Sequence, residues 1–169
     1  MRGNVAISSE PSQGTEVHVV LPLKLGQEAA APAPSAPVTA TPDRERTVLV
    51  AEDDPVNLFT LKAFLERRSY NIVSATNGKE ALEVLAQHPV GEIEAVLMDI
   101  QMPTMSGLEA IERIRNDKAF AEFASIPIVA ITAHAMSGES ETFLEAGADA
   151  YVSKPVDFAE LEAILDKLL

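Results

Sequence analysis

The chain has 169 residues, of which 47% are hydrophobic and only 5% aromatic, and its formal net charge is −13. This composition allows an aliphatic core for one domain of ordinary size. The acidic balance argues against nucleic acid as a partner, because phosphate contacts need clustered Lys and Arg. We expect no direct membrane contact, since no apolar run is long enough to span a bilayer. The absence of cysteine excludes disulfides, and we expect a reducing, cytoplasmic location.

The first section, residues 1–25, predicts a β-hairpin. Two strand-like runs, NVAIS and TEVHVVLPL, flank the turn-forming sequence Pro-Ser-Gln-Gly. Because an isolated hairpin is only marginally stable in water, we expect it to pair with a second copy of the chain in a homodimer, or to pack on the rest of the molecule.

The second section, residues 26–46, predicts a disordered linker. Its sequence, GQEAAAPAPSAPVTATPDRER, consists mainly of Ala, Pro, Ser and Thr. Such a segment buries too little apolar surface to offset the entropy lost on ordering.

The third section, residues 47–169, alternates between strand and helix patterns. Short apolar runs that predict strands are TVLVA, YNIVSA, EAVLMD, IPIVAIT and ADAYVS. Segments with helical periodicity are PVNLFTLKAFLERR, NGKEALEVLAQ, SGLEAIERIRN, MSGESETFLEAG and DFAELEAILDKLL. Five strands alternating with five helices predict an α/β domain of right-handed βαβ units, with a parallel sheet covered by helices on both faces.

Polar side chains stand directly after four of these strands. In doubly wound sheets, binding sites form beyond the carboxyl ends of the strands. The residues at these ends are Glu52, Asp53, Asp54, Asp99, Thr132 and Lys154. Asp54 has a different expected role, because Asp before Pro55 is typical of a helix N-cap followed by proline at the first helical position.

Four motifs carry a resemblance to a known family. The sequences VLVAEDD, VLMDIQMPTMSG, IVAITA and YVSKP, in this order and spacing, resemble the receiver domain of two-component response regulators over Val48–Leu169. The resemblance implies a flavodoxin-like fold whose five parallel strands lie in the order 2-1-3-4-5.

The resemblance also implies an aspartyl-phosphate site. Asp99 matches the phosphoacceptor of the family. Glu52 and Asp53 match the acidic pair that holds Mg²⁺ (or Mn²⁺) together with Asp99 and the backbone carbonyl of Gln101. These are the hard oxygen ligands that such ions prefer. Lys154 supplies positive charge beside the phosphoryl group.

Further roles are implied for residues around this site. Thr132 matches the hydroxyl that contacts the phosphoryl group and takes part in the conformational switch. Tyr151 matches the aromatic residue of that switch, and core packing is an equal alternative for its side chain. The side chains of Gln101 and His134 match positions that tune the lifetime of the phosphoryl group; the alternative for His134 is an ordinary exposed histidine. The peptide bond before Pro155 is expected to be cis.

The expected partner is a histidine kinase or a histidine phosphotransfer protein, which donates a phosphoryl group from phosphohistidine. The segment GNVAISSEPSQGTEVHVVLPL resembles the last hairpin of the ATP-binding domain of sensor histidine kinases. The other kinase motifs are absent, which suggests the C-terminal receiver of a hybrid kinase. Because the sequence ends with the last predicted helix, we expect signalling through protein contacts or onward phosphotransfer.

Two other functions compete with this interpretation. A phosphatase of the haloacid dehalogenase type also uses an Asp nucleophile, Mg²⁺ and Lys, but its nucleophile follows the first strand in a D-x-D pattern, where this chain has EDDP. A degenerate receiver that only binds proteins would not need the complete set of acids, Thr132 and Lys154.

Overall fold

The computed structural model describes residues 4–10, 14–20, 46–133 and 139–169. Most of the predicted linker and His134 lie outside these residues. The chain divides into two compact units, Met1–Asp43 and Arg44–Leu169. In the first unit, β1 (Asn4–Glu10) and β2 (Gly14–Val20) form the predicted antiparallel hairpin.

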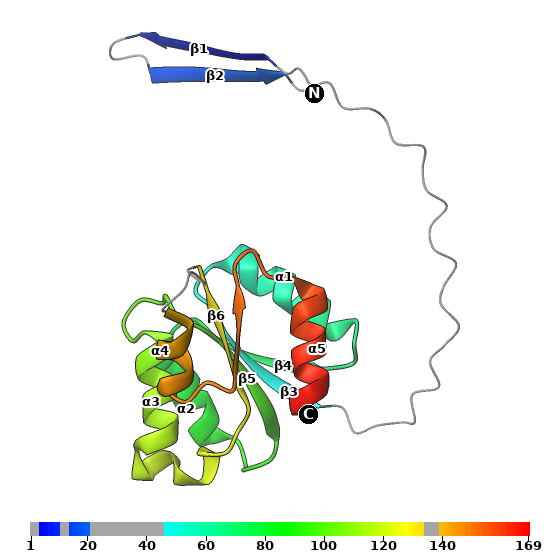
Figure 1. The fold of residues 1–169 in the computed structure, drawn as a ribbon, viewed down its shortest axis with the longest axis vertical. Helices are drawn as coiled ribbons and strands as arrows, with labels where there is room; N and C mark the ends of the chain where they lie inside the picture. The colour runs from blue at the N-terminus through cyan, green and yellow to red at the C-terminus, as the bar shows by residue number, and fades with distance from the viewer. Residues whose placement is uncertain (1–3, 11–13, 21–45, 134–138) are drawn as a thin grey trace, which may run out of the picture. The chain divides into compact units, whose positions relative to one another are not determined.

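The second unit is built on a five-stranded sheet in which every neighbouring pair is parallel (Figure 1). Its strands, from one edge to the other, are β4 (Asn71–Ala75), β3 (Thr47–Ala51), β5 (Ile93–Asp99), β6 (Ile128–Thr132) and β7 (Ala150–Ser153). Numbered within this unit, the order is 2-1-3-4-5. The predicted doubly wound topology is therefore confirmed.

Helices connect the strands and cover both faces of the sheet. They are α1 (Pro55–Glu66), α2 (Gly78–Gln87), α3 (Gly107–Asn116), the 3-10 helix η1 (Lys118–Phe123), α4 (Glu139–Glu145) and α5 (Phe158–Leu168). Figure 1 shows α1 and α5 on one side of the sheet and α2 and α3 on the other. Among the described helices, none has both the length and the apolar character to cross a membrane.

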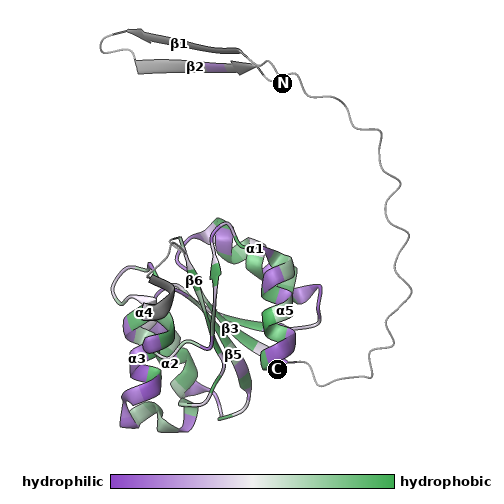
Figure 2. Cartoon of the chain, in the orientation of Figure 1, coloured by the Kyte–Doolittle hydropathy of each residue, from purple (hydrophilic) through white to green (hydrophobic). Residues whose placement is uncertain are grey.

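The alternating side chains of the strands supply two cores. In β3, Val48 and Val50 belong to the core under α1 and α5, whereas Leu49 and Ala51 belong to the opposite one. The strands are accordingly among the most hydrophobic segments in Figure 2. Because both faces are buried, a strand here reads as a continuous apolar run, as the sequence predicted.

Polar caps set the helix starts. The side chain at each N-cap accepts a hydrogen bond from a backbone N–H in the first turn and so satisfies a donor that has no partner within the helix. The caps are Asp54 for α1, Asn77 for α2, Ser106 for α3 and Asp157 for α5. The predicted N-cap role of Asp54 is confirmed, with Oδ1 at 2.9 Å from the backbone nitrogens of both Val56 and Asn57.

Arg115, in the last turn of α3, ties together segments that are distant in the sequence. Its guanidinium donates to the Gly147 carbonyl at 2.7 Å, to the Ala124 carbonyl at 3.0 Å and to Asp149 Oδ2 at 2.9 Å. Burial lowers the pKa of the Arg115 guanidinium, and the charge of Asp149 opposes that shift. The same Asp149 oxygen accepts the Ile128 N–H at 2.8 Å, which fixes the start of β6.

Several details differ from the sequence analysis. Val56 and Phe59, two large apolar residues of the first predicted helix, PVNLFTLKAFLERR, are 69% and 73% exposed. The 3-10 helix η1 was not predicted. Arg46, assigned to the linker, belongs to the sheet unit: its carbonyl accepts the Asn71 N–H at 2.8 Å, and its side chain lies 3.8 Å from Glu94.

The exposure of Phe59 gives a direct test of how α1 packs. We expect Leu61→Ala, which empties a buried position, to lower the free energy of unfolding by about 2–5 kcal/mol. We expect Phe59→Ala on the same helix to change it by no more than about 0.5 kcal/mol. Urea unfolding followed by circular dichroism measures both, and equal losses would contradict this packing.

Candidate functional site

The register of the sheet brings the polar strand ends together. Ala51, the last residue of β3, pairs with Met98 of β5. Glu52 and Asp99 therefore leave neighbouring strands side by side. On the other side of β5, Asp99 pairs with Ile131, so that Thr132 follows at the next position of β6.

The last strand completes the site. Thr132 pairs with Ser153 of β7, and the next residue, Lys154, donates its backbone N–H to the Thr132 carbonyl at 2.7 Å. The Lys154–Pro155 peptide bond that follows is cis. The carboxyl ends of four strands thus deliver Glu52, Asp99, Thr132 and Lys154 to one edge of the sheet.

Three carboxylates form a cluster that suits a divalent cation. Oxygen atoms of Glu52, Asp53 and Asp99 lie within 4.8 Å of one another. Glu52 and Asp99 are almost fully buried, with 1% and 2% of their surface exposed, whereas Asp53 is exposed. Mg²⁺ prefers a few carboxylates and otherwise keeps water or substrate oxygens, so this donor set fits the ion.

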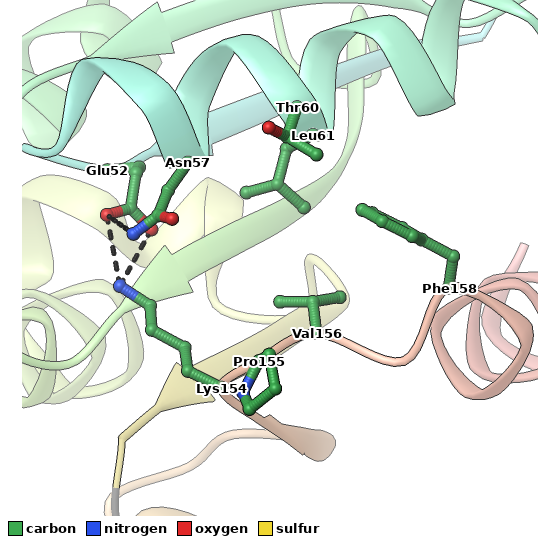
Figure 3. A pocket seen from close by; sticks show the side chains of 8 residues that line it. All are labelled: Glu52, Asn57, Thr60, Leu61, Lys154, Pro155, Val156 and Phe158. Carbon is green, nitrogen blue, oxygen red and sulfur yellow. Dashed lines mark hydrogen bonds and ion pairs between the residues drawn. The ribbon is translucent and has the colours of Figure 1, made fainter. Parts of the chain in front are cut away.

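Lys154 joins the two buried acids. Its ammonium lies 2.7 Å from Asp99 Oδ2, 3.0 Å from Glu52 Oε1 and 2.9 Å from Glu52 Oε2. Figure 3 shows the contacts to Glu52. Burial alone would lower the pKa of Lys154, but the hydrogen bonds to Asp99 and Glu52 outweigh it, and the net shift is upward. The two carboxylates therefore favour the charged ammonium form of Lys154.

Glu52 is the carboxylate most affected by burial. Desolvation raises its pKa, and the hydrogen bonds from Lys154 and Asn57 only partly oppose that shift. Oε1 accepts from Lys154 and from the side-chain amide of Asn57 at 3.2 Å. Oε2 forms an ion pair with the Lys154 ammonium at 2.9 Å, and no other contact from the described residues to this oxygen is a hydrogen bond. A buried carboxylate with so few partners, beside two other acids, fits a metal ligand.

The backbone around Asp99 is held by close packing. Asp99 Oδ1 accepts the Gln101 N–H at 3.1 Å, and the Gly107 N–H donates to the Ile100 carbonyl at 3.0 Å. A Cβ atom on Gly107 would lie 2.0 Å from the Asp99 carbonyl oxygen. Only glycine fits there. Gly107 was not among the site residues expected from the sequence.

The other expected site residues are placed as follows. Thr132 is buried at the end of β6. Tyr151 is half-buried in β7 and packs against the core under α2 and α3. The side chain of Gln101 is exposed. His134 lies outside the described residues.

A small cavity adjoins the site between α1 and the segment that follows β7. It has a volume of about 180 Å³. Its lining residues are Glu52, Asn57, Thr60, Leu61, Lys154, Pro155, Val156 and Phe158. Asn57 was not among the expected site residues. The only signal for it in the sequence is its place in the first turn of the helix that follows the acids.

Comparisons with known proteins agree with this geometry. The family model described as "Response regulator receiver domain" matches residues 48–166. Hybrid signal transduction histidine kinase I of Dictyostelium discoideum is 47% identical over 112 residues, which is 65% of this chain and 6% of that protein. Sensor protein GacS of Pseudomonas syringae pv. syringae is 37% identical over 124 residues, or 73% of this chain and 13% of that protein.

Solved structures and a shorter relative show the same similarity. The receiver domain of sensor histidine kinase PA1611 from Pseudomonas aeruginosa PAO1, described with a magnesium ion coordinated in its active site cleft, aligns with a TM-score of 0.65 and 32% identity. The alignment covers 74% of this chain and 98% of that one. The polar-differentiation response regulator DivK of Brucella anthropi is 35% identical over 66% of this chain and 85% of its own. The chain belongs to the response regulator receiver domain family.

Substitutions of the adjacent acids Asp53 and Asp54 should affect different properties, namely Mg²⁺ affinity for Asp53 and stability for Asp54. We expect Asp54→Ala to lower the free energy of unfolding by about 1 kcal/mol, as a lost N-cap does, without changing Mg²⁺ affinity. Asp157→Ala, which removes the corresponding cap of α5, is the matched control. Asp53→Ala should weaken Mg²⁺ binding in calorimetric titration. If Asp54→Ala weakens it equally, the division between cap and metal ligand is wrong.

Gly107 should tolerate no side chain. We expect Gly107→Ala to lower the free energy of unfolding by about 3 kcal/mol or more, at or above the upper end of ordinary overpacking, because the added methyl meets backbone. Gly91→Ala is a useful comparison, since Gly91 has φ of +82° but open space around the added atom. A smaller loss for Gly107→Ala than for Gly91→Ala in urea unfolding would count against the close contact.

Proposed function

We propose that this receiver domain accepts a phosphoryl group from phosphohistidine on Asp99 and passes the signal on by conformational change or onward phosphotransfer. One observation carries the proposal. Asp99 is a buried carboxylate that lies 2.7 Å from the Lys154 ammonium, and one of its oxygens lies within 4.8 Å of oxygens of Glu52 and Asp53. An aspartate so placed is a nucleophile beside a fixed positive charge and a cation site.

The chemistry needs little beyond positioning and charge. A carboxylate oxygen of Asp99 attacks phosphorus, the new P–O bond forms, and the P–N bond breaks with its electron pair returning to the imidazole nitrogen. Phosphoryl transfer has a loose transition state, so neutralisation of the phosphoryl oxygens matters more than a strong base. Lys154 provides one positive charge at the strand end. A divalent cation held by Glu52, Asp53 and Asp99 would add charge neutralisation and orient the phosphoryl oxygens.

The acyl phosphate is later lost by attack of water on phosphorus. We propose that the exposed side chain of Gln101, and His134, control the access of that water. Thr132, buried at the end of β6, would donate a hydrogen bond to a phosphoryl oxygen. Tyr151, in the neighbouring strand β7, would take part in the conformational change that follows. The backbone carbonyl of Gln101 would complete the metal ligands, with Mg²⁺ as the ion and Mn²⁺ as the alternative of similar ligand preference.

We propose a protein as the phosphoryl donor, namely a histidine kinase or a histidine phosphotransfer protein. Val56 and Phe59 are large apolar side chains exposed on α1, close in sequence to the metal-binding acids. Contiguous exposed apolar patches mark surfaces for protein partners, and Val56 and Phe59, three positions apart, are neighbours on the surface of α1. The similarity to hybrid kinases, of which the chain spans only a small part, supports an origin in such a kinase.

The remaining assignments follow from that origin. The hairpin of β1 and β2 would be the end of a kinase ATP-binding domain, followed by a linker over residues 26–46. A cytoplasmic location and a homodimer paired through the hairpin are the corresponding proposals for the whole protein.

Replacement of the phosphoacceptor gives the test of this function. With Mg²⁺ and a small phosphoryl donor such as acetyl phosphate, we expect the wild-type chain to gain one phosphoryl group and Asp99→Asn to gain none. Intact-mass spectrometry measures the uptake. Asp166→Asn, an identical change at an exposed position of α5, should behave as wild type.

Circular dichroism should show cooperative unfolding for both variants. Uptake by Asp99→Asn at the wild-type level would overturn the assignment of Asp99. No uptake by the wild type from any donor would favour a receiver that only binds proteins.

A further inference from the structure

We propose that Asn57 is a positioning residue of the metal site, and that it acts by holding the carboxylate of Glu52. The inference rests on the function proposed above and adds a residue that neither the motifs nor the cluster of acids includes. Its basis is a side-chain hydrogen bond from the exposed first turn of α1 to a buried acid (Figure 3).

The helix start places Asn57 for this contact. Asp54 Oδ1 accepts the Asn57 backbone N–H at 2.9 Å, which fixes the residue in the first turn. Its side-chain Nδ2 then donates to Glu52 Oε1 at 3.2 Å. The cap and the amide thus link the start of α1 to the end of β3 across only a few residues.

Glu52 needs such a partner for two reasons. A glutamate has one more side-chain torsion to fix than an aspartate, so a single orientation costs more conformational entropy. Lys154 alone does not fix it, because the same ammonium also bonds Asp99 at 2.7 Å. Among the described side chains, Asn57 and Lys154 are the two that donate hydrogen bonds to Glu52.

The two donors converge on one oxygen. Both Asn57 and Lys154 donate to Oε1, whereas the one described contact of Oε2 is its ion pair with the same Lys154 ammonium at 2.9 Å. With Oε1 held by Asn57, Oε2 is the oxygen that has fewer protein partners and that would serve a metal ion. Partners that orient a ligand in this way commonly change metal affinity without touching the metal.

A purely structural role for Asn57 makes a different prediction. Alanine has a higher helix propensity than asparagine, and the cap from Asp54 reaches the backbone of residue 57, which substitution leaves in place. Asn57→Ala should therefore keep α1 intact and remove only the hydrogen bond to the Glu52 carboxylate. Metal affinity and stability are separate measurements, and the proposal concerns the first.

The experiment is a calorimetric titration of the full chain with Mg²⁺. We expect Asn57→Ala to bind Mg²⁺ about tenfold more weakly than wild type. This is the lower end of the loss in metal affinity that typically follows when a residue hydrogen-bonded to a metal ligand is replaced. Asn57→Leu, which restores volume without the amide, should show the same weakening. Thr60→Val is the control, because Thr60 lines the same cavity but its hydroxyl donates to the Val56 carbonyl at 2.7 Å instead.

A double-mutant cycle identifies the route of the effect. In a Glu52→Asp background the carboxylate is one methylene shorter, and we expect Asn57→Ala to cause no further loss of Mg²⁺ affinity. A full loss in that background would show that Asn57 acts by another route. Wild-type affinity in Asn57→Ala or Asn57→Leu, with cooperative urea unfolding, would overturn the inference about Asn57 alone. Absence of Mg²⁺ binding by the wild type would instead overturn the proposed metal site itself.

Discussion

The ammonium of Lys154 holds together an arrangement that would otherwise be unfavourable. Glu52 and Asp99 are both buried and leave adjacent strands, so their negative charges lie next to each other in a poorly solvated place. Lys154 contacts both, at 3.0 Å and 2.7 Å. Removing one partner of such a buried ion pair typically costs about 3–5 kcal/mol. The fold therefore tolerates a reactive carboxylate at this edge because β7 delivers a cation to it.

The rest of the domain serves this contact by keeping the strand ends in register. Parallel pairing aligns β3, β5, β6 and β7 so that their last residues are neighbours, and two apolar cores clamp the sheet from both faces. At the edge itself, small features decide the geometry. Gly107 lets α3 approach the backbone of Asp99, and Asp54 starts α1 beside Glu52. Strands carry the charged groups, whereas the large apolar side chains of Val56 and Phe59 on α1 are exposed.

Much of this could be predicted from the sequence, because the signals were local. Continuous apolar runs such as that of β3 indicate a strand buried on both faces, and Asp54 before Pro55 marks a helix start. Glu52, Asp99, Thr132 and Lys154 could be placed together, since parallel strand ends share one edge.

Other features depend on contacts that no local pattern encodes. Asn57 is an ordinary polar residue in a helix until its amide meets Glu52, and Arg115 joins three distant segments through hydrogen bonds to carbonyls and Asp149. The need for Gly107 arises from the approach of α3 to Asp99. Phe59 fits the helical pattern, yet α5 and the sheet cover only one side of α1, and the ring is left in solvent. The segment η1 lacks a helical apolar stripe, and its cap is Asp117, a residue equally common in turns.

The proposed function depends on the identity of the phosphoacceptor, the carboxylate paired with Lys154. Its most direct measurement is to phosphorylate the chain with acetyl phosphate and Mg²⁺, reduce the acyl phosphate with borohydride, and map the product by peptide mass spectrometry. Reduction converts a phosphorylated aspartate to homoserine, and we expect homoserine at position 99 and at none of the other acids. Homoserine at Asp53, or phosphate that resists reduction on another residue type, would contradict it.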